Sequence, residues 1–203
     1  MLWLDGEGDA RALARFHRLD PRWKRSGRGR LSRSPSLFED IIKTVTSCNV
    51  AWPNTMTMNE MLCMHAGPRA KQAAGMPEHG NAFPRPLQLA RKRAGTLRSR
   101  CRVGYRDQRI IDLAKLYNRG EISEAWLTDP ANTDAEVLKF LVSLPGSGPY
   151  AARNIMQLVG RYGHVPVDTE TVRHAKTVLG FTGTNRAIEN RAAARYDAFG
   201  DQA

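Results

Sequence analysis

The stretch of this sequence best suited to binding another molecule is LPGSGPYAA, at residues 144–152. Its two glycines carry no Cβ, so the backbone can approach a ligand closely, and Gly148 can take a conformation closed to other residues. Pro149 suits the first position of a helix, where unpaired N–H groups and the positive end of the helix dipole favour an anion. The stretch therefore predicts a phosphate-binding turn.

A carboxylate, Asp168, follows 20 residues after Gly148 within the sequence PVDT. A carboxylate held in a dry cleft can stabilise positive charge that develops during a reaction, and it can orient a water molecule. Asp168 also precedes a predicted helix that ends at Gly180, and aspartate is a preferred N-cap residue. The residues alone leave both interpretations of Asp168 open.

Helices on both sides must position the turn. In front of it, the apolar residues of 137–142 have helical spacing, Thr133 or Asp134 can cap the start of that helix, and Pro145 ends it. Behind it, the apolar residues of 155–159 form one face of a second helix. The pattern predicts a helix-hairpin-helix.

The rest of the chain also has helical spacing. Further helices are predicted at 9–16, 37–47, 55–65 and 107–119 and in the tail 184–203, with a loop rich in proline and glycine at 66–86. The helix at 37–47 starts with a capping box from Ser36 to Glu39, and its buried face comprises Phe38, Ile41, Ile42 and Val45. No segment alternates as a half-buried strand does, so the fold class is predicted to be all-α.

The composition indicates a polyanionic partner. The 203 residues include 31 Lys and Arg against 20 Asp and Glu, a formal net charge of +11. No apolar run approaches the roughly 18 residues that span a bilayer, so no membrane association is expected.

The hairpin sequence LPGSGPYAA, followed by PVDT at 166–169, resembles the helix-hairpin-helix superfamily of base-excision DNA glycosylases, and most closely its bacterial 3-methyladenine and 8-oxoguanine branch. The resemblance covers roughly residues 28–180. It implies two helical lobes with a cleft between them and no N-terminal β domain. The expected organisation is a basic N-terminal segment at 1–34 and a glycosylase domain at 35–203, with the hairpin at 144–148.

The resemblance implies a monofunctional glycosylase that hydrolyses the N-glycosidic bond of a flipped, damaged base. Asp168 would be the catalytic carboxylate. Tyr150 stands where bifunctional relatives have a lysine, and because a phenol cannot form a Schiff base, no AP-lyase activity is expected. The ring of Tyr150 would line the base pocket. An alkylated purine such as 3-methyladenine is the first choice of base, and 8-oxoguanine or a mismatched pyrimidine are alternatives.

The DNA contacts that the resemblance implies are Asn49, Gly146, Ser147, Gly148, Arg106 and Arg109. Asn49 would enter the gap left by the flipped base, although asparagine also tolerates the left-handed conformation at a helix C-cap, and both interpretations stay open. A non-catalytic or truncated helix-hairpin-helix DNA-binding protein is the alternative function. Asp168 separates the two, because a carboxylate facing DNA would repel a phosphodiester and serve no purpose in a binder.

The three cysteines, Cys48, Cys63 and Cys101, are too few to hold an iron-sulfur cluster, so no such cofactor is expected. No metal site is predicted with certainty, but the resemblance implies a monovalent cation bound by hairpin carbonyls, with Leu144 and Gly146 as candidates. The expected partner is double-stranded DNA that contains a damaged base. The protein is expected to act as a monomer in the cytoplasm, in association with the nucleoid.

Overall fold

The computed structural model describes residues 6–21, 24, 31–70, 80–196 and 200. Over these residues the chain is helical, and its only β-type pairing is an isolated bridge between Arg69 and Asn81. The chain divides into two compact units. Unit 1 comprises Met1–Pro35, Leu127–Val142 and Pro149–Ala203, and unit 2 comprises Ser36–Trp126 and Ser143–Gly148. The predicted all-α fold with two helical lobes is confirmed.

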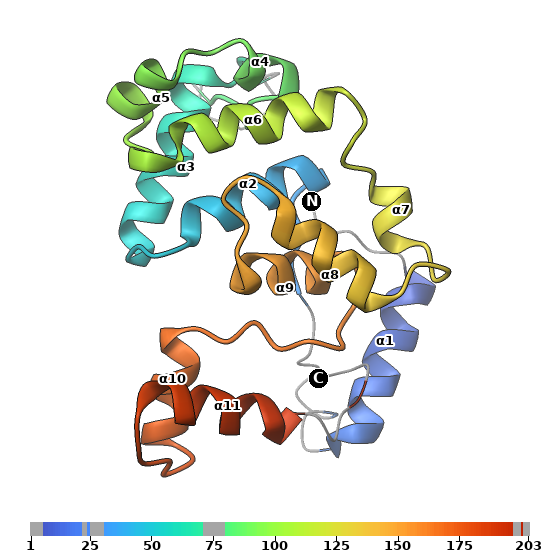
Figure 1. The fold of residues 1–203 in the computed structure, drawn as a ribbon. Helices are drawn as coiled ribbons and strands as arrows, with labels where there is room; N and C mark the ends of the chain where they lie inside the picture. The colour runs from blue at the N-terminus through green and yellow to red at the C-terminus, as the bar shows by residue number, and fades with distance from the viewer. Residues whose placement is uncertain (1–5, 22–23, 25–30, 71–79, 197–199, 201–203) are drawn as a thin grey trace. The chain divides into compact units, whose positions relative to one another are not determined.

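Unit 2 is organised around one helix, α6, against which three other helices of the unit pack (Figure 1). Its elements are α2 (Leu37–Ser47), α3 (Trp52–Ala66), α4 (Pro86–Ala90), α5 (Ala94–Cys101), the 3₁₀ helix η2 (Gly104–Arg106) and α6 (Asp107–Asn118). Helix α6 packs against α2, α4 and α5, while α3 packs against α2 and α5. In α6 the residues Ile110, Leu113 and Ala114 are fully buried, and the helix ends at Asn118 with Arg119 as its C-cap.

The start of α2 follows the predicted capping pattern. Ser36 Oγ accepts a hydrogen bond from the Glu39 amide at 3.3 Å. The acidic side chains of Glu39 and Asp40 in the first turn interact favourably with the positive end of the helix dipole. The predicted buried face is confirmed, since Phe38, Ile41, Ile42 and Val45 are at most 2% exposed. This helix and α6 form the apolar interior of unit 2.

Unit 1 contains the helices on both sides of the hairpin. Its elements are α1 (Gly6–Leu19), the end of α7 (Glu124–Thr128), α8 (Asp134–Ser143), α9 (Pro149–Leu158), α10 (Thr169–Thr177) and α11 (Asn185–Tyr196). A separate apolar cluster joins α10 to α11 through Val172, Ala175, Ile188 and Ala192. Thr133 caps α8, because its amide donates to Glu136 Oε2 at 2.8 Å and its Oγ1 accepts from the Glu136 amide at 3.3 Å.

Arg161 ties the chain after α9 to the chain before α8. Its guanidinium forms an ion pair of 2.6 Å with Asp134 and donates to the carbonyl oxygens of Leu127 and Asp129, each at 2.6 Å. An arginine can make several such bonds because its donors lie in a fixed plane. These bonds fix the far ends of the two hairpin helices within unit 1.

Three helices were not predicted: α4, α5 and α7. They have five to eight residues, and α5, with the sequence AGTLRSRC, buries only Leu97 and Cys101. Helix α1 is longer than the predicted 9–16. The basic run Gly27–Arg30 and part of the predicted loop 66–86 lie outside the described residues.

The three cysteines are free thiols. Burial raises the pKa of Cys48, of Cys63 and of Cys101, so none is favoured as a reactive thiolate at neutral pH. No helix in the described part of the chain combines the length and the apolar character needed to cross a membrane.

Candidate functional site

The predicted hairpin is present between α8 and α9. The Ser147 amide donates to the Leu144 carbonyl oxygen at 3.0 Å, which closes the turn. Gly146 has a φ of +80°, and a Cβ added there would lie 3.1 Å from Arg109 Cδ and 3.4 Å from Val45 Cγ1. Glycine is therefore required at position 146 for its backbone conformation and for the space that Arg109 occupies.

Gly148 differs from Gly146. Its backbone lies outside the left-handed region, so Gly148 does not use the conformational freedom noted from the sequence, and Gly146 is the hairpin glycine that does. A Cβ added at Gly148 would meet nothing within 4 Å. The residue is exposed directly before the first turn of α9. The open space there leaves the backbone accessible to a ligand, as the phosphate-binding interpretation needs.

Ser147 is buried, with 5% of its surface exposed. Its Oγ has no hydrogen-bond partner within the described residues. A buried hydroxyl without a partner is uncommon, because its lost hydration is not replaced. The Ser147 side chain is thus placed inside the turn, and a contact from this residue to DNA would have to come from its backbone.

Arg106 has a structural position in unit 2. It is 5% exposed, its Nε donates to the Val45 carbonyl oxygen at 3.2 Å, and its Nη2 donates to the Cys48 carbonyl oxygen. These carbonyls belong to the end of α2, where the Val45 carbonyl also accepts from the Cys48 amide at 3.4 Å. Sequence analysis suggested a phosphate contact for Arg106, but the buried guanidinium instead holds the turn that follows α2.

Asn49 lies in that turn. It is exposed and has a φ of +52°, while the C-cap of α2 is the preceding residue, Cys48. The left-handed backbone is the one that the capping interpretation of Asn49 expected. The exposed side chain equally meets the requirement of the second interpretation, insertion into DNA.

An exposed aromatic residue, Tyr105, was not singled out from the sequence. Its side chain is 51% exposed. The guanidinium of Arg106 lies 4.5 Å from its ring centroid and that of Arg109 lies 4.9 Å away. An aromatic ring placed between arginines is typical of nucleic-acid surfaces, because bases stack on it and phosphates approach the cations. The sequence GYRDQR at 104–109 contained this signal.

Two residues after Tyr105, the buried carboxylate of Asp107 pairs with the exposed Arg98. Asp107 is 2% exposed and accepts from Arg98 Nε and Nη2, each at 2.9 Å, and from the Gln108 amide at 2.8 Å. Burial alone would raise the pKa of Asp107, but the hydrogen bonds from Arg98 and from the Gln108 amide outweigh it and hold this pKa below its ordinary value. The pair joins α5 to the start of α6.

Asp168 is the N-cap of α10. Its Oδ1 accepts from the Thr171 amide at 2.8 Å and from Thr171 Oγ1 at 3.0 Å, and its own amide donates to Thr171 Oγ1 at 3.3 Å. Its second oxygen, Oδ2, accepts no hydrogen bond from the residues described. The capping interpretation of Asp168 is therefore confirmed, and the same bonds leave one oxygen of a half-buried carboxylate available to a ligand.

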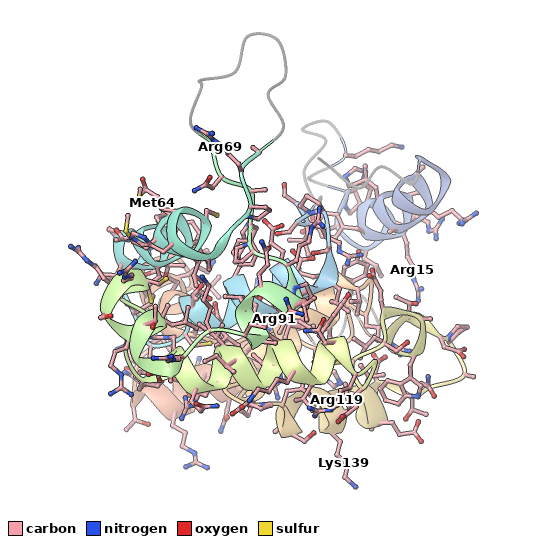
Figure 2. The ribbon with its side chains drawn as sticks, turned by 90° about the horizontal axis from the view of Figure 1, so that it is seen from above. Arg15, Met64, Arg69, Arg91, Arg119 and Lys139 are labelled. Carbon is pink, nitrogen blue, oxygen red and sulfur yellow. The ribbon has the colours of Figure 1, made fainter. Side chains whose placement is uncertain are left out.

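Tyr150 is the second residue of α9 and is half-buried. Its carbonyl oxygen accepts from Asn154 Nδ2 at 3.0 Å, within the first turn of the helix. Two lysines of unit 1 are placed differently: Lys139 is exposed and extends away from α8 (Figure 2), and Lys176 donates to Asn185 Oδ1 at 2.8 Å.

The predicted site residues fall into two groups. Unit 1 contains Asp168 and Tyr150, and unit 2 contains Asn49, Arg106, Arg109, Gly146, Ser147 and Gly148. Within unit 2 the structure brings together the hairpin glycine and Arg109, and it brings together Arg106 and the Asn49 turn.

Solved structures match this chain over nearly its whole length. MBOgg1 in complex with a low-affinity DNA ligand is 25% identical with a TM-score of 0.72, and the match covers 97% of this chain and 65% of that one. The 8-oxoguanine glycosylase/lyase of Clostridium acetobutylicum is 20% identical with a TM-score of 0.72, over 96% and 67% of the two chains. The Schizosaccharomyces pombe 3-methyladenine DNA glycosylase Mag1, in complex with abasic DNA, is 17% identical with a TM-score of 0.64, over 93% and 92%.

The chain has the helix-hairpin-helix glycosylase fold. It spans about two thirds of the length of the first two of these structures. No protein-family model and no curated protein matches it. The fold therefore rests on the helices and the hairpin described above, and on the structural matches.

Proposed function

We propose that this protein is a monofunctional DNA glycosylase of base-excision repair, which hydrolyses the N-glycosidic bond of a flipped, damaged base in double-stranded DNA. The observation that carries the proposal is the geometry of Asp168. Two hydrogen bonds from Thr171 orient its carboxylate through Oδ1, while Oδ2 has no donor among the described residues. An oriented carboxylate can stabilise the positive charge that develops on the sugar, and it can position the attacking water.

Tyr150 supports the monofunctional assignment. The side chain at the start of α9 is a phenol, and a phenol cannot form the Schiff base that leads to strand cleavage. Lys139, on α8, extends into solvent (Figure 2). Lys176 donates a hydrogen bond to Asn185. With no amine at position 150, water is the nucleophile that the chemistry leaves.

An alkylated purine is the proposed substrate class. A purine methylated at N3 or N7 carries a formal positive charge, and an aromatic ring such as that of Tyr150 attracts a cation stacked on it. The structural neighbours include both 8-oxoguanine and 3-methyladenine glycosylases, so each class of base has a place in the test below.

We propose that unit 2 binds DNA, and the net charge of +11 on the whole chain favours binding to a polyanion. The open backbone at Gly148 would accept a phosphate, Arg109 would contact a second one, and Tyr105 and Asn49 would contact the bases at the flipped position. The implied monovalent cation would be bound by the carbonyl oxygens of Leu144 and Gly146. The unpartnered Oγ of Ser147 supports this proposal, because it is a further oxygen ligand in the same turn.

A non-catalytic DNA-binding protein is the second candidate function. The observation in its favour is the capping box of α10, which accounts for an aspartate at position 168 without any catalysis. Excision activity separates the two candidates, since DNA binding is common to both.

The test is a set of duplexes that each contain one altered base: 7-methylguanine, ethenoadenine, hypoxanthine, 8-oxoguanine, or thymine opposite guanine. Each is incubated with the protein and analysed with and without alkali. We expect excision of an alkylated purine, with strand breaks only after alkali, and no excision by an Asp168→Asn control. Binding to every duplex without excision of any base would contradict the enzyme assignment and favour the second candidate.

A further inference from the structure

Two non-glycine residues in the described part of the chain have a left-handed backbone, Asn49 with φ +52° and Arg102 with φ +56°. Both lie in unit 2, and both adjoin a segment that Arg106 holds in place: Arg106 bonds the Cys48 carbonyl next to Asn49, and its amide donates to the carbonyl of Val103 next to Arg102. Asparagine tolerates this conformation, whereas for arginine it is unfavourable.

The position of Arg102 is one where glycine is usual. It is the C-cap of α5, and helices commonly end on a left-handed glycine because glycine has no Cβ to clash. Its neighbours force the conformation, since Cys101 is 1% exposed and Val103 is fully buried. The fold therefore determines the backbone at position 102 but gives no reason for an arginine there.

No contact of the Arg102 side chain within the described residues offsets the conformational energy of its left-handed backbone. The side chain is exposed, and it makes no hydrogen bond or ion pair with any residue the structure describes. Arg100, in the last turn of α5, is likewise exposed and unpaired over the same residues. Arg98 on the same helix shows the contrast, because it is bound to Asp107. A favourable interaction with the helix dipole does not explain Arg102 either, because a cation elsewhere in the last turn would serve without a left-handed backbone.

The surroundings of Arg102 indicate its ligand. Tyr105, three residues later, is exposed and has the guanidinium of Arg109 beside its ring. Strained backbone that no local contact explains is typical of ligand-binding positions. An unpaired guanidinium three residues before an exposed aromatic residue suits a nucleic-acid backbone, since arginine binds phosphate through two donors at once.

We propose that Arg102, assisted by Arg100, is a phosphate contact to double-stranded DNA, outside the hairpin and placed by the left-handed end of α5. This inference rests on the proposed DNA-binding function, and it adds to the hairpin and Arg109 a second phosphate-binding segment in unit 2.

The experiment measures binding of an undamaged duplex over a series of salt concentrations, together with the thermal midpoint of each variant. Arg102→Gly removes the charge and relieves the backbone. We expect the slope of log K against log[salt] to fall in magnitude by about 0.9, which corresponds to about eightfold weaker binding at 0.1 M salt. The thermal midpoint should stay the same or rise, because glycine suits the left-handed position. Arg102→Lys keeps the charge and should keep the slope, and Arg100→Gln should lower it by a similar step.

The matched control is Arg119→Gln. Arg119 is exposed in the same unit and pairs with Glu121. It follows the C-terminal end of α6 (Figure 2), whereas Arg102 precedes the N-terminal end, and a helix of 12 residues is about 18 Å long. The substitution removes the same charge and should leave the slope unchanged. An unchanged slope in Arg102→Gly, an equal loss in Arg119→Gln, or a lowered thermal midpoint in Arg102→Gly would each overturn the inference. These readouts use undamaged DNA, so they are independent of whether any base is excised, and a protein that binds as expected but excises nothing would contradict only the proposed enzyme.

Discussion

The stem of Arg109 fills the space where Gly146 would otherwise have a side chain, so that a Cβ at Gly146 would lie 3.1 Å from Arg109 Cδ. The guanidinium of the same arginine lies 4.9 Å from the centroid of the exposed Tyr105 ring. One side chain thus connects the hairpin to the aromatic surface of unit 2. A substitution at Gly146, Arg109 or Tyr105 should therefore change the positions of the other two side chains or of the hairpin backbone.

The two hairpin glycines should respond differently to substitution by alanine. Gly146→Ala places a Cβ on a left-handed backbone and against Arg109, so we expect the free energy of unfolding to fall by about 1–2 kcal/mol. Gly148→Ala meets open space and should leave that free energy within about 0.5 kcal/mol. Denaturant unfolding measures both.

The same Gly148→Ala variant tests the phosphate site, because its fold should be intact. Binding should weaken for damaged and undamaged duplexes alike, since contacts to phosphate do not read the base. A loss restricted to damaged duplexes would instead place Gly148 in the base pocket.

Asp168 should separate its capping role from its chemical role. Asparagine is as good an N-cap as aspartate, so Asp168→Asn should keep α10 while excision falls by at least about 10²-fold, and DNA affinity should be equal or higher. Asp168→Ala should lose excision and also about 1 kcal/mol of stability. Single-turnover excision and thermal unfolding give the two readouts, and full activity in the asparagine variant would leave Asp168 as a cap only.

The unmodified protein should leave an intact abasic strand. Borohydride should trap no covalent protein–DNA adduct, because position 150 offers a phenol in place of an amine. Tyr150→Lys tests the position itself, since an amine near the start of α9 is expected to form some adduct. A stoichiometric trapped band from the unmodified protein would require another lysine, such as Lys139 or Lys176, to reach the sugar.

Stability should fall in acid because of Asp107. Its pKa in the folded protein lies below the ordinary value of 3.8, so the stabilisation is fully present above about pH 4 and is lost as the pH falls through the folded value. Asp107→Asn should flatten the dependence of unfolding free energy on pH below about pH 4, and Arg98→Gln should flatten it in part. Equal acid slopes in all three proteins would show that the pair with Arg98 does not stabilise the fold.

The sequence predicted the elements whose signals are local. The Ser36 cap, the apolar face of α2 and the stop after α6 depend on neighbouring residues, and the structure has all three. The predicted capping box is present only in its Ser36 half, because the Glu39 side chain pairs with Lys43. The short helices α4, α5 and α7 were missed because their apolar residues are too few to show a period.

The candidate site shows the same division. The hairpin and its flanking helices follow from glycine, proline and helical spacing. The burial of Arg106 does not follow from the sequence, because basic residues are usually exposed. Its partners, the carbonyls of Val45 and Cys48, are also about 60 residues away along the chain. The sequence also does not say which hairpin glycine is left-handed, since the contact between Gly146 and Arg109 joins residues that are distant in sequence.

Under the proposed function, the buried guanidinium of Arg106 would also affect the kinetics of DNA recognition. Because a side chain of the protein itself holds the carbonyls at the end of α2, the Asn49 turn has its shape before any DNA arrives. A turn ordered in advance loses little conformational entropy on binding, which favours a search in which many undamaged sites are sampled and released quickly. The energetic discrimination would then fall to the proposed flipping of the base, since a damaged base that is already weakly stacked leaves its pair more readily than a sound one.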